Sequence, residues 1–388
     1  MTTKASKVSF SITATGNLTI DWGDGETYSG SGSDAFNISH SYSSTSEHSI
    51  TIAGGNIERL DCTSNQLTTL DVSKNTKLET LDCHNNPLTT LDVSRNTALT
   101  NLTCGYNPLT TLDLSNNTVL TYLTCHNNPL LTTLDLSHNT ALTDLICQSN
   151  PLLTTLDVSN NTALTNLRCN YNPLLTALDV SNNTALTNLE YCGNPLITAL
   201  DLSSNKALTY FICMSNPLTI LDLSSNSALT YLNCSFNQLT TLDVSKNTKL
   251  EKLECCCNPL TTLEVSGNTA LTSLACHCNL LTTLVVSDNT ALTHLFCFDN
   301  KLTTLDVSGN TALILLDCMG NELTASAIND LFRTLPYIPE PRYGLIDIYY
   351  NPGRPDCDRS IAEDKGWRLE YPYDRNTVRQ LLELNMHF

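Results

Sequence analysis

Apolar and polar residues alternate along most of this chain in a pattern that repeats every 21 or 22 residues, from about Ile57 to Glu322. Each repeat holds two copies of the sequence L-x-x-L-x-(C/V/L)-x-x-N, in which apolar residues recur at alternate positions. Such alternation is typical of short β-strands that bury one face. One repeat cannot bury its apolar residues alone, so the period predicts a solenoid of stacked turns. We therefore expect a β-rich solenoid of about 13 turns, with two parallel stacked strands in each.

Cysteine occupies one strand position in nearly every repeat. Aligning Asn194 with the other repeats puts Tyr191 where one cysteine is missing. A free cysteine behaves as a small apolar side chain, so we expect the repeat cysteines to fill a narrow core as free thiols. We expect the Asn at each strand end to point inward and bond the backbone of the bend. The repeat cysteines are Cys62, Cys83, Cys104, Cys125, Cys147, Cys169, Cys213, Cys234, Cys255, Cys276, Cys297 and Cys318.

The repeat resembles a known family. L-x-x-L-x-C-x-x-N-x-L resembles the signature of leucine-rich repeats, and L-T-T-L-D-V-S-x-N-T resembles the 21-residue class of BspA-like bacterial surface proteins. This resemblance implies a leucine-rich repeat solenoid over residues 57–323. It also implies a non-catalytic scaffold for binding or adhesion that recognises a protein or a glycan at a bacterial cell surface or outside the cell.

The segments that flank the repeats predict caps, because the open end of a solenoid exposes an apolar sheet edge. Residues 1–56 alternate around glycine-rich turns and predict a short β cap. Within it, the motifs at 21–25 (D-W-G-D-G) and 40–42 (H-S-Y) resemble PKD-type β domains. Residues 324–370 predict a small α/β cap, and the tail at 371–388 predicts one further helix.

Charge limits the classes of partner. The chain carries 38 acidic and 20 basic residues, a net charge of −18, which argues against a nucleic-acid partner. No apolar stretch is long enough to cross a bilayer, so membrane insertion is not expected. No signal peptide is present at the start, so the protein is either secreted with its leader missing from this sequence or cytoplasmic. The oligomeric state does not follow from the sequence.

No recognised catalytic motif is present, and we expect no enzyme and no cofactor. Two alternatives stay open: a purely structural spacer, and an enzyme with its site in residues 324–388. The acidic and aromatic candidates for such a site are Asp347, Tyr349, Asp356 and Asp358.

Calcium is a possible ligand of the N-terminal cap. Asp21, Asp24 and Glu26 supply carboxylates around Trp22, although Gly-Asp-Gly is more typical of a hairpin turn.

Four residues depart from the repeat and suggest a metal site. Stacking of 21-residue turns places Cys256 beside His277 in one column, and Cys257 beside Cys278 in the next. Four such ligands could hold a tetrahedral Zn²⁺. A disulfide between Cys257 and Cys278, or plain free thiols, are the alternatives. His84 and His126 share a column two turns apart, so we expect them to be separate surface residues.

The two strands of each turn differ in their outward residues. The L-D-V strands repeat Thr, Asp and Ser from 69–73 to 304–308, and we call this side the regular face. The L-x-C strands change at every turn, and we call this side the variable face. Exposed apolar side chains there favour partner contact. The expected contact residues are Tyr210, Ile212, Met214, Tyr231 and Phe236 in one group, and His294, Phe296 and Phe298 in a second.

The regular face stacks one carboxylate on the next at nearly every turn. Like charges about 5 Å apart repel, which opposes the hydrogen bonds that neighbouring Thr and Ser donate to the charged form. We expect repulsion to raise the pKa of these carboxylates. Stability should then rise as the pH falls from neutral toward about 4–5.

Overall fold

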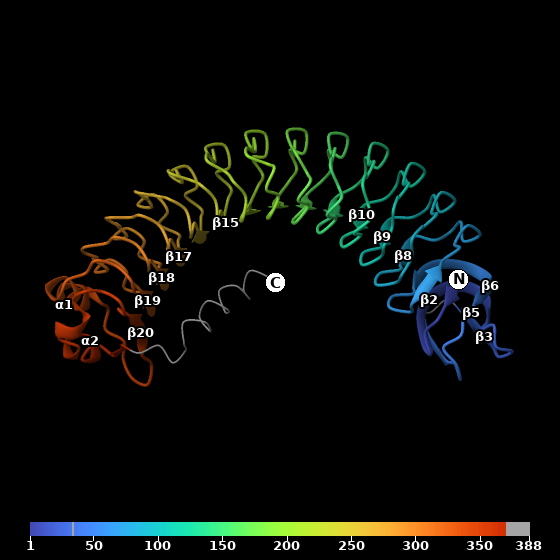
Figure 1. Ribbon diagram of the computed structural model, residues 1–388, viewed down its shortest axis with the longest axis horizontal. Coiled ribbons are helices and arrows are strands. Elements are labelled where there is room, and N and C mark those ends of the chain that lie inside the picture. The colour runs from blue at the N-terminus through green and yellow to red at the C-terminus, as the bar shows by residue number, and fades with distance from the viewer. Residues whose placement is uncertain (33–34, 370–388) are drawn as a thin grey trace. The chain divides into compact units, whose positions relative to one another are not determined.

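The computed structural model describes residues 1–32 and 35–369, in two compact units, Met1–Pro217 and Leu218–Phe388 (Figure 1). In both units the chain winds through successive turns with one short strand each, so the predicted β-solenoid is confirmed. The helix predicted at 371–388 lies outside the described residues.

The first unit opens with the predicted β cap. Strand β2 pairs antiparallel with β3, β4 and β6, and its alternate side chains Val8, Phe10 and Ile12 are buried. Strand β6 then pairs parallel with β8 and so starts the solenoid ladder. The cap strands are β1 (Thr2–Thr3), β2 (Lys7–Asp21), β3 (Thr27–Gly32), β4 (Ala35–Ser41), β5 (His48–Ser49) and β6 (Thr51–Asp61).

The L-x-C segments form three-residue parallel strands, and within each unit each strand pairs in register with the next. In the first unit these are β8 (Thr80–Asp82), β9 (Asn101–Thr103), β10 (Tyr122–Thr124), β11 (Asp144–Ile146), β12 (Asn166–Arg168), β13 (Asn188–Glu190) and β14 (Tyr210–Ile212). In the second unit they are β15 (Tyr231–Asn233), β16 (Lys252–Glu254), β17 (Ser273–Ala275), β18 (His294–Phe296) and β19 (Leu315–Asp317).

The prediction that the L-D-V segments form a second parallel sheet is wrong for most of the described chain. Of the L-T-T-L-D-V segments, only β7 (Leu67–Thr69) is a strand, and isolated bridges such as Asp71–Asp92 replace a continuous ladder. The backbone turns after these segments, as at Asp113, whose Oδ1 accepts a hydrogen bond from the amide of Ser115 at 2.9 Å. The same bond follows Asp82 and Asp317, which end strands β8 and β19, and Val285 forms only a bridge without any carboxylate. The Asp side chain therefore does not by itself account for the missing ladder.

Asparagine side chains join each turn to the one before it, and their inward orientation is confirmed. The Nδ2 of Asn172 donates to the carbonyls of Cys169 in its own turn and Cys147 in the preceding turn. Asn183, at the end of the L-D-V segment, is fully buried and donates to Val158 and Asn161 of the preceding turn, both at 2.9 Å. These bonds add donors to buried backbone carbonyls at the bends, such as that of Val158, which also accepts the amide of Asn161.

The core contains the leucines and the column of repeat cysteines, all of which are buried. Burial raises the pKa of these thiols, to about 12 for Cys125. The predicted replacement of one repeat cysteine by Tyr191 is confirmed. Tyr191 takes the cysteine position, is fully buried, and stacks near Phe211 with ring centroids 6.0 Å apart.

The second unit ends in the predicted α/β cap. Helix α1 (Ala325–Thr334) begins after Thr324, whose side chain accepts from the amide of Ala327. The ladder continues from β19 into the parallel strands β20 (Gly344–Asp347) and β21 (Trp367–Arg368). The short helices η1 (Arg354–Asp356) and α2 (Ser360–Glu363) lie between these two strands in the chain.

The carboxylates of the regular face do not have the raised pKa values that we expected. The pKa of most of its carboxylates is lowered, because the Ser two residues later donates hydrogen bonds from its amide and hydroxyl; like-charge repulsion is the smaller effect. The predicted rise in pKa is therefore wrong, since hydrogen bonds favour the charged form at short range while water screens exposed charges.

The asparagine bonds predict a large difference between two adjacent residues. Asn183→Ala should lower the free energy of unfolding by about 1–3 kcal/mol, because two buried carbonyls each lose one of their donors. Asn182→Ala is the matched control. Asn182 is exposed, so its loss should cost less than about 0.5 kcal/mol. Urea unfolding of both variants measures this difference, and equal losses would contradict the role given to the buried side chain.

The lowered carboxylate pKa values predict acid sensitivity. Stability from a carboxylate with a lowered folded pKa is present above the unfolded pKa of about 3.9 and is lost as the pH falls through the folded value. We expect wild type to lose stability between roughly pH 4 and 2, and Asp113→Asn to lose less. Burial raises the pKa of Asp317 to about 8, so its protonation changes the stability at higher pH, outside this window. Urea midpoints of wild type and Asp113→Asn that fall equally between about pH 4 and 2 would contradict the role given to the carboxylate hydrogen bonds.

Candidate binding face and thiol–imidazole cluster

The variable face consists of four columns of side chains in each unit. The columns are formed by the first and third residues of each strand, the residue after the repeat cysteine, and the residue before the inward Asn. The last column has left-handed backbone, for example φ 53° at Cys257 and 55° at Cys278. In the second unit these four columns are Tyr231, Lys252, Ser273, His294 and Leu315; Asn233, Glu254, Ala275, Phe296 and Asp317; Ser235, Cys256, His277, Phe298 and Met319; and Phe236, Cys257, Cys278, Asp299 and Gly320.

The first predicted contact group is divided between the two units. Tyr210 and Ile212 are partly exposed in the first unit, whereas Tyr231 and Phe236 belong to the second. The expectation that Met214 is exposed is wrong, because its side chain is only 8% exposed. A long unbranched thioether folds readily onto its neighbours, so the residue type alone does not show exposure.

Tyr231 lies in a polar network and not in an apolar patch. Its hydroxyl donates to Glu254 at 3.2 Å, and the Lys252 ammonium lies 5.2 Å from its ring centroid. Lys252 and Glu254 themselves form an ion pair of 2.7 Å. Phe236 is more open, with 41% of its surface exposed.

The second predicted group forms two aromatic pairs on the variable face, one of them with the added residue His277. His277 stacks on Phe298 with centroids 4.0 Å apart and an interplanar angle of 8°. His294 and Phe296 lie 6.4 Å apart on the same strand. Burial, and then the charge of Lys252, lower the pKa of His294, which keeps this ring uncharged near neutral pH. We call His277, His294, Phe296 and Phe298 the aromatic group.

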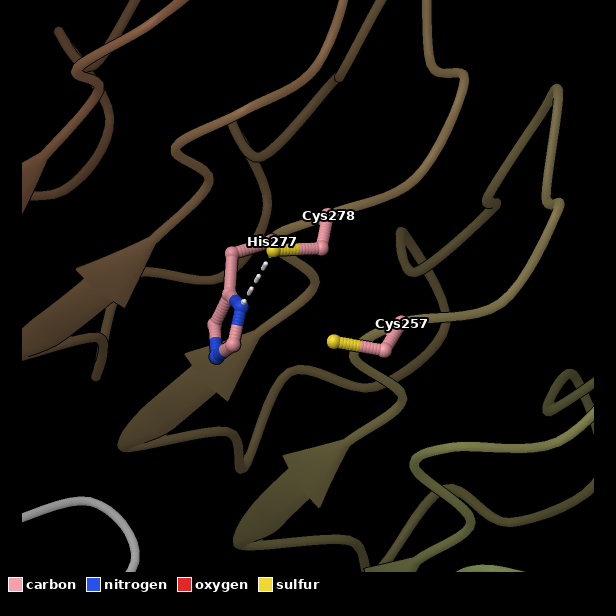
Figure 2. Close-up of side chains that lie close together, drawn as sticks. All are labelled: Cys257, His277 and Cys278. Atoms are coloured by element: carbon pink, nitrogen blue, oxygen red, sulfur yellow. Dashed lines mark hydrogen bonds between the residues drawn. The ribbon is translucent and has the colours of Figure 1, made fainter. Parts of the chain in front are cut away.

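Three of the four predicted metal ligands come together. One ligand atom each of Cys257, His277 and Cys278 lies within 4.8 Å of the other two, and all three residues are partly exposed (Figure 2). The Nδ1 of His277 is 3.5 Å from the Sγ of Cys278. A hydrogen bond with Cys257 and burial raise the pKa of the Cys278 thiol, whereas the hydrogen bond with His277 acts in the opposite direction. We call these residues the thiol–imidazole cluster.

Cys256 does not belong to this cluster, so the predicted four-ligand set is wrong in this member. Its side chain is 4% exposed, and its thiol donates to the carbonyl of Ala275 at 3.3 Å. A cysteine in the column of His277 therefore uses a neighbouring carbonyl as its partner and turns away from the other sulfurs.

The structure overturns the expectation that His84 and His126 are separate. Their ring centroids are 5.5 Å apart, and the Tyr106 ring lies 5.0 Å from each. Gly105 occupies the position between them, where a Cβ would be 2.7 Å from the His126 ring. Burial and the nearby His84 lower the pKa of His126. A glycine between two histidines in one column was the sequence signal for this contact.

The carboxylates of the N-terminal cap accept hydrogen bonds from the backbone of their own turn, and one of them pairs with a histidine. Asp21 accepts from the amide of Gly23, and Asp24 accepts from the amide of Glu26 and pairs with His40 at 2.7 Å. The hydrogen bond with His40 is the main cause of the lowered pKa of Asp24. In the described part of the chain, the thiol–imidazole cluster is the only group of three or more close metal-ligating side chains, so calcium binding stays a prediction without a converging ligand set.

The acids proposed for a C-terminal active site lie on separate segments. Asp347 ends β20 in register with Asp317, and burial raises the pKa of both. Asp356 is in η1, and Asp358 accepts from Ser360 before α2. Tyr349 stacks against the Arg354 guanidinium at 3.6 Å.

A shallow groove, which was not predicted from the sequence, lies on the regular face of the first unit. Its lining is rich in hydroxyls and carboxylates. It consists of Thr69, Leu70, Thr90, Leu91, Asp92, Ser94, Thr111 and Asp113.

Comparison with known proteins identifies the repeat. Residues 55–96 match the family model for leucine-rich repeats in two copies, and residues 127–148 match a further leucine-rich repeat model. Comparison with curated proteins gives no match. Within residues 1–32 and 35–369, no helix has the length and apolar character needed to cross a membrane.

Solved structures share the fold, and one of them also shares more than a third of the aligned sequence. The functional domain of InlJ from Listeria monocytogenes, which includes a cysteine ladder, is 37% identical over 76% of this chain and 74% of its own, with a TM-score of 0.56. The internalin InlF from the same species is 25% identical over 71% and 84%, with a TM-score of 0.62. The Leptospira interrogans protein LIC12759 is 20% identical over 80% and 95%, with a TM-score of 0.60, and shows the fold alone. With this similarity to InlJ and the parallel ladder of L-x-C strands, the chain belongs to the leucine-rich repeat family.

Proposed function

We propose that this protein is a non-catalytic scaffold that binds a protein partner through its variable face. The observation that carries the proposal is the difference between the two faces. The regular face repeats Thr, Asp and Ser, whereas the variable face places the partly exposed aromatic group beside columns that change at every turn. Contiguous exposed apolar side chains usually mark contact surfaces, and aromatic side chains contribute much of the energy at protein interfaces.

The charges around the aromatic group define the chemistry of the partner. Glu254 and Asp299 lie on the same face of the second unit, and Lys252 is already paired with Glu254. The whole chain carries a net charge of −18. A partner with an apolar surface bordered by Lys or Arg would complement this face, and long-range attraction would speed its association.

The family membership supports a binding role, since leucine-rich repeat arrays offer extended binding surfaces. We further propose the BspA-like class, a PKD-like N-terminal cap, and a location at a bacterial cell surface or outside the cell. The sequence motifs and the similarity to InlJ and InlF of Listeria monocytogenes support these finer assignments. A glycan ligand, a purely structural spacer and a cytoplasmic location are the competing hypotheses.

A photo-crosslinking amino acid placed at position 296 and tested in cells distinguishes a protein partner from a glycan ligand and from a structural spacer. A crosslinked protein that is captured at 296 and not at position 283 supports the proposal, because Thr283 is exposed on the regular face of the same unit. Binding to a glycan array with no protein crosslink would favour the glycan, and failure of both would favour the spacer.

Substitutions in the aromatic group should weaken binding without unfolding the protein. Phe296→Ala should cost about 2 kcal/mol of binding free energy for the crosslinked partner, roughly a 30-fold increase in Kd. The stability of the variant should stay within about 0.5 kcal/mol of wild type, because Phe296 is partly exposed. Calorimetric titration gives the affinity, and thermal unfolding gives the stability. Tyr210→Ala tests the first unit in the same way.

The regular face supplies the controls. Thr283→Ala should leave Kd unchanged, and so should Thr90→Ala in the groove of the first unit. If Thr90→Ala weakens binding while Phe296→Ala does not, the groove is the binding site and the two faces have been assigned the wrong way round.

A further inference from the structure

The thiol–imidazole cluster goes beyond the binding role proposed above. We propose that Cys257, His277 and Cys278 bind one Zn²⁺ ion, with the carboxylate of Asp299 as the fourth ligand.

The distances between the ligand atoms fit a tetrahedral ion. With Zn–S of about 2.3 Å and Zn–N of about 2.05 Å, tetrahedral angles place a sulfur and a nitrogen about 3.6 Å apart. The Nδ1 of His277 is 3.5 Å from the Sγ of Cys278. The Sγ of Cys257 lies within 4.8 Å of both atoms, so zinc binding requires it to move toward them by up to about 1 Å.

The backbone holds the ligands in place before any ion binds. Cys257 and Cys278 both have left-handed backbone, and their side chains come from adjacent turns of one column. The amide of Cys257 donates to the carbonyl of His277, and that of Cys278 donates to the carbonyl of Phe298. The stack on Phe298 fixes the His277 ring with Nδ1 toward the sulfurs. Pre-positioned ligands of this kind reduce the cost of ordering a site.

Asp299 continues the column on the next turn, outside the group of three close ligand atoms, and its carboxylate becomes the fourth ligand by moving toward Cys257 and His277. Its Oδ2 is 3.9 Å from the Sγ of Cys278, near the separation of about 3.6 Å for a sulfur and an oxygen on one zinc ion. Gly320 follows in the same column, and a side chain there would collide with the Asp299 carboxylate. The glycine thus leaves room for the carboxylate beside the sulfurs.

The chemistry of the donors favours zinc over the alternatives. Two sulfurs, one imidazole and one carboxylate form a set that borderline-soft tetrahedral cations prefer, whereas calcium and magnesium take oxygen ligands. On binding, both thiols release their protons to solvent, and two thiolates with one carboxylate face the dication. The repeat cysteines cannot do this, because each is fully enclosed in the core.

The test uses the full chain, purified with a reducing agent and without chelators. Elemental analysis should find about one equivalent of zinc. Cobalt added to the zinc-free protein should give the thiolate charge-transfer and visible bands of a tetrahedral site. Cys257→Ser, His277→Ala and Cys278→Ser should each remove these bands. Asp299→Asn should weaken cobalt binding about 10- to 100-fold.

Cys256→Ser is the matched control, because Cys256 is adjacent in sequence and its thiol bonds the Ala275 carbonyl instead. It should keep the full cobalt spectrum. The circular dichroism of every variant should match wild type, since all the turns are complete without an ion. The proposal is overturned if reduced wild-type protein gives no tetrahedral cobalt spectrum. A Cys257–Cys278 disulfide in protein isolated from its native source, or a Cys256→Ser effect as large as that of Cys278→Ser, would also overturn it.

Discussion

The structure depends on the asparagine side chains that cross from one turn to the next. A three-residue strand forms too few backbone bonds to fix the position of a whole turn, and the bends between strands leave buried carbonyls without a donor. The amide of Asn172 supplies that donor to Cys147 and Cys169, and its Oδ1 accepts from the amide of Asn150. Each side chain thus ties two turns together at a fixed rise, so the leucines and cysteines above and below meet in register.

This constraint separates the positions that can vary from those that cannot. Inward Leu, Cys and Asn positions are fixed by packing and by the bonds between turns. In the L-x-C strands, the ladder uses only backbone groups, so the outward side chains carry no structural hydrogen bond that every turn needs. The column before the inward Asn requires left-handed backbone, which Asn, Ser and Tyr adopt here alongside Cys257 and Cys278. Sequence change therefore accumulates on one face at little cost to the fold.

The periodic features of this fold could be predicted from the sequence, and the contacts that depend on side-chain direction could not. The repeat itself indicates the parallel ladder, the inward Asn and the buried Tyr191. The column that a residue occupies, in contrast, does not show in which direction its side chain points. Cys256 shares a column with His277 but bonds a carbonyl, and Met214 folds down onto the surface. His84 and His126 meet across two turns only because Gly105 leaves the space between them open.

Alternation alone misled the prediction of a second sheet on the regular face. L-D-V has the period of a strand, but adjacent segments form only isolated bridges, whether the residue after Leu is Asp, Glu or Val. In most turns the Asp accepts the amide of the Ser two residues later. Glu264 keeps the same bond through its longer side chain, to Ser266 at 2.9 Å, so the acceptor matters more than the identity of the acid. The sequence uniformity of this face thus follows from its hydrogen bonds. On the regular face, the acidic side chains already accept hydrogen bonds within their own turns, so few groups remain to bind a partner. This is the physical reason to place recognition on the variable face.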